Sequence, residues 1–213
     1  MLDAADRDDL AALGTWCEYD TGEPLLHQGA PSRDLYVLVE GRVRIVMTTP
    51  EGDELLLAVL GPGATVGELS ALDGEPRSAT VLALEPVRAL RVSARSFGQF
   101  LLARPQAVVG LLRVLSGRLR AADERRLGLS VAPAEQRLAR GLLSLAAEHG
   151  RVIDDGVRLT ALLSQADLAA YVGLSREAVN QALRALREDG LVATARRSVT
   201  ILDLDGLRAR ATG

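Results

Sequence analysis

Two short segments contain the residue types that hold a phosphorylated ligand. Gly67-Glu68-Leu69-Ser70 is followed, after a turn at residues 73–76, by Arg77-Ser78. A glycine lets backbone amides approach an anion, and a short helix starting at Glu68 would add its positive end. Arg77 would supply charge and Ser78 a hydroxyl for one phosphate, while Glu68 can accept a ribose hydroxyl. The alternative is a solvated surface ion pair, which contributes little stability.

A second motif lies near the carboxyl end. Ser164-Gln165-Ala166-Asp167 has the spacing of a capping box, with Asp in place of the more usual Glu, and predicts a short helix that ends at Gly173. Ser175 then caps a second helix over residues 176–187. Two short helices joined by a turn with glycine are typical of a helix-turn-helix. The segments 191–194 and 198–202 follow and predict a hairpin wing.

The second of these helices presents a polar face. Arg can donate twice to guanine, Glu can accept from cytosine, and Asn or Gln can bridge adenine in the major groove of double-stranded DNA. A solvated helix face would look similar, but the capped first helix and the arginine-tipped wing occur with it and favour DNA binding. The predicted DNA-binding residues are Ser164, Gln165, Ser175, Arg176, Glu177, Asn180, Gln181, Arg184, Arg196 and Arg197.

The phosphate-type residues belong to a region of short apolar stretches. From about Thr21 to Val92, runs such as 35–39, 43–46 and 55–60 predict strands, and glycines recur between them. Short strands with frequent turns and no intervening helices indicate an antiparallel barrel or sandwich. Ser93 then predicts the cap of a short helix, and Pro105 the first turn of a long one.

The long helix has a heptad pattern that indicates a partner helix. Its apolar positions recur at alternating spacings of four and three, which is typical of a seam with an identical helix. The alternative is a helix packed only on its own domain. The seam comprises Val108, Leu112, Leu115, Leu119, Ala122, Arg126 and Leu129, with Arg126 the one interruption.

The helical pattern breaks at Val131-Ala132-Pro133, which predicts a hinge. We therefore expect an α+β chain with an N-terminal antiparallel β-roll, jelly-roll-like, over residues 1–104. A dimerisation helix and hinge would occupy residues 105–132, and a winged helix-turn-helix residues 133–213. Within the last part, an amphipathic helix is expected to end at His149-Gly150.

Composition excludes several classes of protein. The 213 residues are 48% hydrophobic and 25% charged, with a net charge of −3, which is ordinary for a folded domain. Cys17, His27 and His149 are the only cysteine and histidines, so cysteine-built clusters and a His-dependent triad are not expected, nor is a metal site. Because no long apolar run or basic-then-apolar leader is present, we expect a cytoplasmic protein without a membrane span.

These motifs together resemble a known family. Gly67-Glu68-Leu69 with residues 76–81 is similar to the phosphate-binding cassette of cyclic-nucleotide-binding domains. Combined with residues 168–179, it resembles the cyclic-AMP receptor protein and FNR family of bacterial transcription regulators, over about Leu25 to Leu202. The resemblance implies a homodimer that binds a palindromic operator, with RNA polymerase as a candidate further partner.

The resemblance also implies roles for single residues. Glu68 would bind the ribose hydroxyl, Arg77 with Ser78 the cyclic phosphate, and Gly67, Leu69 and Ser70 would shape the loop. The expected effector is cyclic AMP, with cyclic GMP as the second choice and no covalent cofactor. Ala122 and Asp123 stand where cyclic-AMP-responding members place Thr with Ser or Asn, and Gln181 stands where the receptor protein carries Arg.

Three other interpretations remain. The same DNA-binding regulator would respond to a different effector or to none. A cyclic-nucleotide-binding module would act on a protein partner, which leaves the recognition helix and wing unused. An enzyme is the third class, but Gly61-Pro62-Gly63 lacks the third glycine and the βαβ unit of a dinucleotide site.

Overall fold

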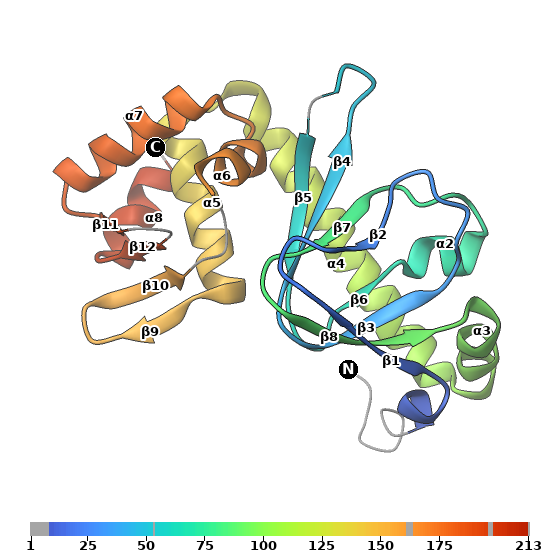
Figure 1. The fold of residues 1–213 in the computed structure, drawn as a ribbon. Helices are drawn as coiled ribbons and strands as arrows, with labels where there is room; N and C mark the ends of the chain where they lie inside the picture. Colours follow the sequence, from blue (N-terminus) through green and yellow to red (C-terminus); the bar gives the residue numbers. More distant parts are fainter. Residues whose placement is uncertain (1–8, 53, 161–163, 196–197, 213) are drawn as a thin grey trace. The chain divides into compact units, whose positions relative to one another are not determined.

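A computed structural model describes residues 9–52, 54–160, 164–195 and 198–212 (Figure 1). The chain divides into two compact units, Met1–Ala121 and Ala122–Gly213. The wing-tip residues Arg196 and Arg197 lie outside the described residues.

The first unit is built on two antiparallel sheets, as the sequence predicted. One sheet has the strand order β1-β8-β3-β6 and the other β2-β7-β4-β5. Buried apolar side chains such as Leu38, Val43 and Val81 form its core. The sheet begins earlier than the expected start at Thr21, because β1 pairs with β8 through Thr15 to Tyr19. The strands are β1 (Thr15–Tyr19), β2 (Pro24–Leu26), β3 (Leu35–Glu40), β4 (Val43–Thr48), β5 (Glu54–Leu60), β6 (Thr65–Val66), β7 (Thr80–Ala83) and β8 (Val87–Val92).

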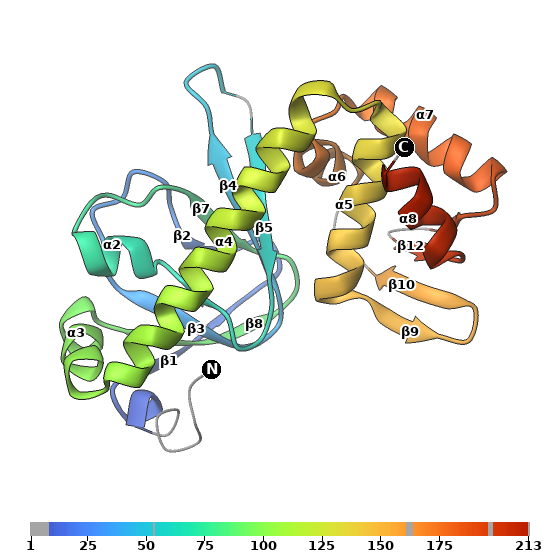
Figure 2. The same cartoon turned by 180° about the vertical axis from the view of Figure 1, so that it is seen from behind.

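Helices close one side of this β-roll. In chain order, α2 (Glu68–Asp73) comes between β6 and β7, and α3 (Ala94–Ala103) follows β8. The Ser93 Oγ caps α3 as predicted, accepting a hydrogen bond of 3.1 Å from the Ser96 amide. α4 (Pro105–Val131) begins at the predicted proline. Figure 2 shows its first part, up to Ala121, crossing one side of the β-roll.

Part of the predicted seam on α4 is exposed to solvent. Leu112 and Leu119 are 57% and 63% exposed, whereas Val108 and Leu115 are half-buried. The side chains of Arg126 and Leu129 lie outside the described part of the helix. Within the described residues, no single helix is both long and apolar enough to cross a membrane, and α3 with α4 passes that test only as a pair bent by 115°.

The second unit is a set of helices on a small sheet. Its strands pair in the antiparallel order β11-β12-β10-β9. The hairpin β11–β12 is the expected wing, but β9–β10 and α8 are additional elements. Leu138, Leu142, Leu186 and Leu207 are fully buried between the helices. The elements are α5 (Ala134–His149), β9 (Arg151–Ile153), β10 (Gly156–Thr160), α6 (Gln165–Val172), α7 (Arg176–Glu188), β11 (Val192–Ala195), β12 (Ser198–Ile201) and α8 (Leu204–Thr212).

Candidate functional site

Gly67 occupies a position in the β-roll that only glycine fits without strain. It precedes α2 with a φ of 79°, in the left-handed region that side chains with a Cβ rarely adopt. A Cβ added there would lie 2.6 Å from Nη1 of Arg77 and 3.0 Å from the backbone oxygen of Asp34. The glycine therefore sets both the start of α2 and the close approach of Arg77.

Arg77 lies directly beneath this turn. Its side chain is only 3% exposed, with Nε donating to Ser32 Oγ at 3.1 Å and Nη1 to the carbonyl of Gly67 at 2.8 Å. Nη2 donates to the carbonyl of Asp34. Burial lowers the pKa of Arg77 from its usual value, while the charges of Asp34 and Glu68 oppose the shift. Among the described residues, these contacts use three of the five guanidinium N–H groups, so two are left for a further acceptor.

Glu68 is a buried carboxylate whose two oxygens differ in their hydrogen bonding. The residue is 4% exposed, and its Oε1 accepts from Nη1 of Arg118 at 2.7 Å. Its Oε2 is buried and has no hydrogen-bond partner among the described residues. A buried polar atom without a partner is costly, so it marks a place where a donor from a ligand would be favourable.

Arg118 belongs to this site but was not among the residues predicted from the sequence. It projects from α4 and also donates through Nη2 to the carbonyl of Thr65 at 2.7 Å. The sequence offered no signal for this role, because Arg118 occupies a flanking position of the heptad between Leu115 and Leu119, where charged side chains are common. Because Glu68 and Arg118 are 50 positions apart, only the fold reveals that they meet.

The other predicted effector residues differ in how far they are exposed to solvent. Ser70 is buried beside Glu68, and Leu69 and Ser78 are exposed on the surface. Arg77 thus turns inward and Ser78 outward from the same short segment. Ala122 and Asp123 belong to the second unit, where Ala122 is half-buried and Asp123 is exposed. Their proposed contact with the effector stays a prediction.

The helix-turn-helix of the second unit has the local geometry that the sequence predicted. Asp167 N donates to Ser164 Oγ at 3.1 Å, and Ser164 N donates to Asp167 Oδ2 at 3.0 Å, which completes the capping box. α6 ends at Gly173 with a φ of 63°. Ser175 Oγ then accepts from Ala178 N at 3.1 Å and starts α7.

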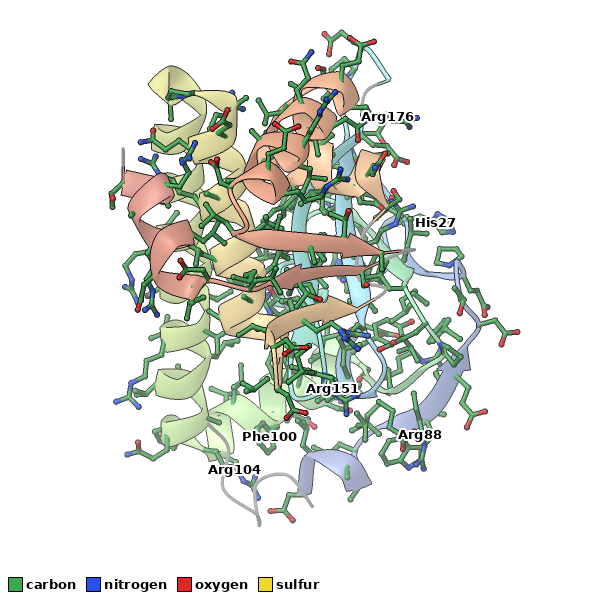
Figure 3. All side chains as sticks on the ribbon, turned by 90° about the vertical axis from the view of Figure 1, so that its left-hand side faces the viewer. His27, Arg88, Phe100, Arg104, Arg151 and Arg176 are labelled. Atoms are coloured by element: carbon green, nitrogen blue, oxygen red, sulfur yellow. The ribbon has the colours of Figure 1, made fainter. Side chains whose placement is uncertain are left out.

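α7 separates an apolar face from a polar one. Val179, Leu183 and Leu186 are buried, as expected. Arg184 pairs with Glu188 at 2.9 Å on the solvent side. Figure 3 shows Arg176 projecting from the first turn of the helix. The remaining predicted DNA-binding residues within the described chain are also exposed: Ser164, Gln165, Ser175, Glu177, Asn180 and Gln181.

Neither unit offers a metal site within the residues that the structure describes. No group of three or more His, Cys, Asp or Glu side chains is arranged to hold an ion there. Cys17 is a free thiol whose Sγ donates to the carbonyl of Thr15 at 3.7 Å. His27 is exposed on the loop after β2, in the position labelled in Figure 3.

A β-roll with a buried Glu and Arg under a glycine turn, followed by a winged helix-turn-helix, defines the class of ligand-responsive DNA-binding regulators. Residues 16–104 match the family model described as a cyclic nucleotide-binding domain. Residues 136–210 match the Crp-like helix-turn-helix domain. The chain belongs to the Crp/Fnr family of transcription regulators.

Curated relatives cover most of the chain. It is 34% identical over 194 residues to the CRP-like cAMP-activated global transcriptional regulator of Mycobacterium tuberculosis, covering 91% of this chain and 87% of the relative. It is 35% identical over 174 residues to the cyclic AMP receptor protein of Thermus thermophilus, covering 82% and 77%.

Solved structures agree with the fold. A CRP-family transcriptional regulator from Thermus thermophilus has a TM-score of 0.78 at 29% identity, covering 92% of this chain and 97% of that one. The c-di-GMP-responsive global regulator CLP of Xanthomonas campestris has a TM-score of 0.83 at 24% identity, covering 94% and 100%. The second likeness concerns the fold alone.

Proposed function

We propose that this chain is a cytoplasmic homodimer whose affinity for a palindromic operator is controlled by a cyclic nucleotide, cyclic AMP first and cyclic GMP second. The main support for the effector site is the buried carboxylate of Glu68, whose Oε2 has no hydrogen-bond partner among the described residues. A buried arginine, Arg77, lies beside it. A ribose hydroxyl supplies the missing donor, and a phosphate supplies an acceptor for guanidinium N–H groups.

The phosphate would sit at the segment where α2 starts. Arg77 has two N–H groups beyond its contacts with Ser32, Gly67 and Asp34, and Ser78 presents an exposed hydroxyl close along the chain. Gly67, with Leu69 and Ser70, would keep this loop open to the ligand. No covalent cofactor takes part in this proposal.

The base of the nucleotide would be read from α4. Ala122 and Asp123 stand where the family's cyclic-AMP-responding members place hydroxyl or amide side chains. An ionised Asp123 accepts a hydrogen bond from an amino group but donates none. The exocyclic amino groups of adenine and guanine both meet that requirement, so the pair predicts altered selectivity rather than loss of binding.

The dimer would form through α4. Leu112 and Leu119 are exposed in the single chain at the spacing of a coiled-coil seam. Burying such side chains against an identical helix removes apolar area from water. In the dimer, two copies of α7 would enter successive major grooves about 34 Å apart.

Base reading would fall to the exposed face of α7. Arg176 and Glu177 occupy its first turn, the end of a recognition helix that reaches base edges. Asn180, Gln181 and Arg184 continue the face along the groove. Ser164, Gln165 and Ser175 would contact phosphates, as would Arg196 and Arg197, which lie outside the described residues.

Selection of bound duplexes from a random library, with and without cyclic AMP, tests the proposed function. A palindrome with half-sites spaced by about one helical turn is expected. RNA polymerase recruitment can then be measured on that site. Recovery of no sequence preference by the purified wild-type protein would contradict the proposal.

A second candidate is the same regulator with another effector or none. The observation in its favour is the pair Ala122 and Asp123, which departs from the cyclic-AMP pattern. In that case the duplex selection yields the same palindrome, and its affinity does not change when cyclic AMP or cyclic GMP is added.

A further inference from the structure

One face of α5 packs against the C-terminal end of α6. Arg137, Gly141 and Ser144 are spaced by four and three positions, so they lie along the same side of the helix. Each contacts the last residues of α6. Arg137 donates through both Nε and Nη2 to the carbonyl of Val172, at 3.2 and 2.8 Å, and through Nη2 to the carbonyl of Gly173.

The other two contacts bring the helices close together. A Cβ added at Gly141 would lie 2.4 Å from Cγ1 of Val172, so α6 packs directly on the backbone of α5 at this point. One turn further, the hydroxyl of Tyr171 donates to Ser144 Oγ at 3.3 Å. α5 is thus a platform that fixes the position of the last turn of α6.

The turn between α6 and α7 restricts how α7 can be oriented. The amides of Gly173 and Leu174 both donate to the carbonyl of Ala169, and Ser175 caps α7 immediately afterwards. The last carbonyls of a helix have no intrahelical partner and need another donor. A guanidinium that takes the carbonyls of Val172 and Gly173 fixes the point from which α7 starts.

We propose that Arg137 is a positioning residue for DNA reading: its guanidinium holds the carbonyl end of α6 and so sets the orientation of α7. Arg137 itself touches no base in this proposal. The inference rests on the proposed DNA-binding function and concerns only how the base-reading face is held. Without the hydrogen bonds of Arg137, α7 stays folded but samples a wider range of orientations. Sequence-specific DNA binding therefore weakens before the stability of the unit falls.

Arg140 supplies a matched control. It lies on the same helix and its Nε donates to a backbone carbonyl, that of Ala211 in α8, at 2.8 Å. Arg137→Gln and Arg140→Gln therefore remove the same charge and the same type of contact from α5. Only the first change releases the turn before α7. Arg137→Lys keeps the charge but has a single donor nitrogen in place of the planar guanidinium, and serves as the conservative variant.

The experiment measures the dissociation constants of the full chain for the selected palindrome and for an unrelated duplex of equal length, by fluorescence anisotropy. If the reading orientation is populated only a tenth of the time in Arg137→Gln, its affinity for the palindrome falls about tenfold. Affinity for the unrelated duplex should stay within about twofold of that of Arg140→Gln, since phosphate attraction depends on charge. Arg137→Lys should recover part of the loss.

Amide hydrogen exchange separates positioning from general loss of structure. Exchange at Leu174 is expected to quicken in Arg137→Gln and not in Arg140→Gln, with both variants melting at similar temperatures. Equal palindrome-to-unrelated affinity ratios in the two glutamine variants would overturn the inference. Failure of the wild-type protein to prefer any palindrome would instead overturn the proposed function.

Discussion

Replacement of Gly67 by alanine tests whether the turn at Gly67 is packed directly against the guanidinium of Arg77. Alanine at a φ of 79° costs about 1–2 kcal/mol for the left-handed backbone alone. The new Cβ also falls 2.6 Å from Nη1 of Arg77, and that guanidinium cannot retreat without losing contacts to Ser32 and Asp34. Overpacking of this kind costs a further ~1–3 kcal/mol.

Gly63 provides the matched control for this change. It also has a positive φ, 86°, but a Cβ there meets nothing within 4 Å. Gly63→Ala should therefore show the backbone cost without the contact cost. Urea unfolding followed by the fluorescence of Trp16 gives both values, because this single tryptophan lies on β1 of the β-roll. Losses that agree within about 0.5 kcal/mol would refute the packing of Arg77 against this turn.

Arg176→Ala should weaken palindrome binding by about 1–3 kcal/mol and relax one base position, as measured by repeating the duplex selection; an unaltered preference would remove its reading role. Replacing Leu112 and Leu119 together by Asp should yield monomers in sedimentation, and a dimer mass would refute the seam. Arg42 donates two hydrogen bonds of 2.8 Å to Glu85 and lowers the pKa of that carboxyl. The pair therefore stabilises the fold above the pKa that Glu85 has in the unfolded chain. This stabilisation is lost as the pH falls through the lower pKa of Glu85 in the folded chain. Arg42→Gln should remove no more than about 1 kcal/mol, and only on the neutral side of that transition; equal losses in acid would contradict the assignment.

Local signals in the sequence predicted the helix caps well. Ser93, Ser164 and Ser175 each accept from an amide three positions further on, so the whole interaction lies within one helical turn. Strands β3, β4 and β5 were equally legible, because their apolar runs are bounded by turn residues. The polar face of α7 followed directly from its helical period.

Contacts between distant segments could not be read in the same way. Arg118 reaches Glu68 across 50 positions, and Arg137 reaches Val172 across 35. The sequence assigned Arg77 to the ligand, but burial and three partners within the fold give it a structural role as well. Composition and spacing do not report which way such a side chain turns.

Binding of a cyclic nucleotide by the segment around Gly67 and Arg77 is the proposal on which the rest of the function depends. Calorimetric titration of the purified protein with cyclic AMP and with cyclic GMP tests it most directly. Ser78→Ala serves as the informative variant, because Ser78 is exposed and its loss leaves the buried contacts of Arg77 in place. We predict saturable heat with at least one nucleotide in the wild type, weakened in Ser78→Ala at an unchanged melting temperature. No heat with either nucleotide, together with no shift in the melting temperature of the wild type, would contradict the claim.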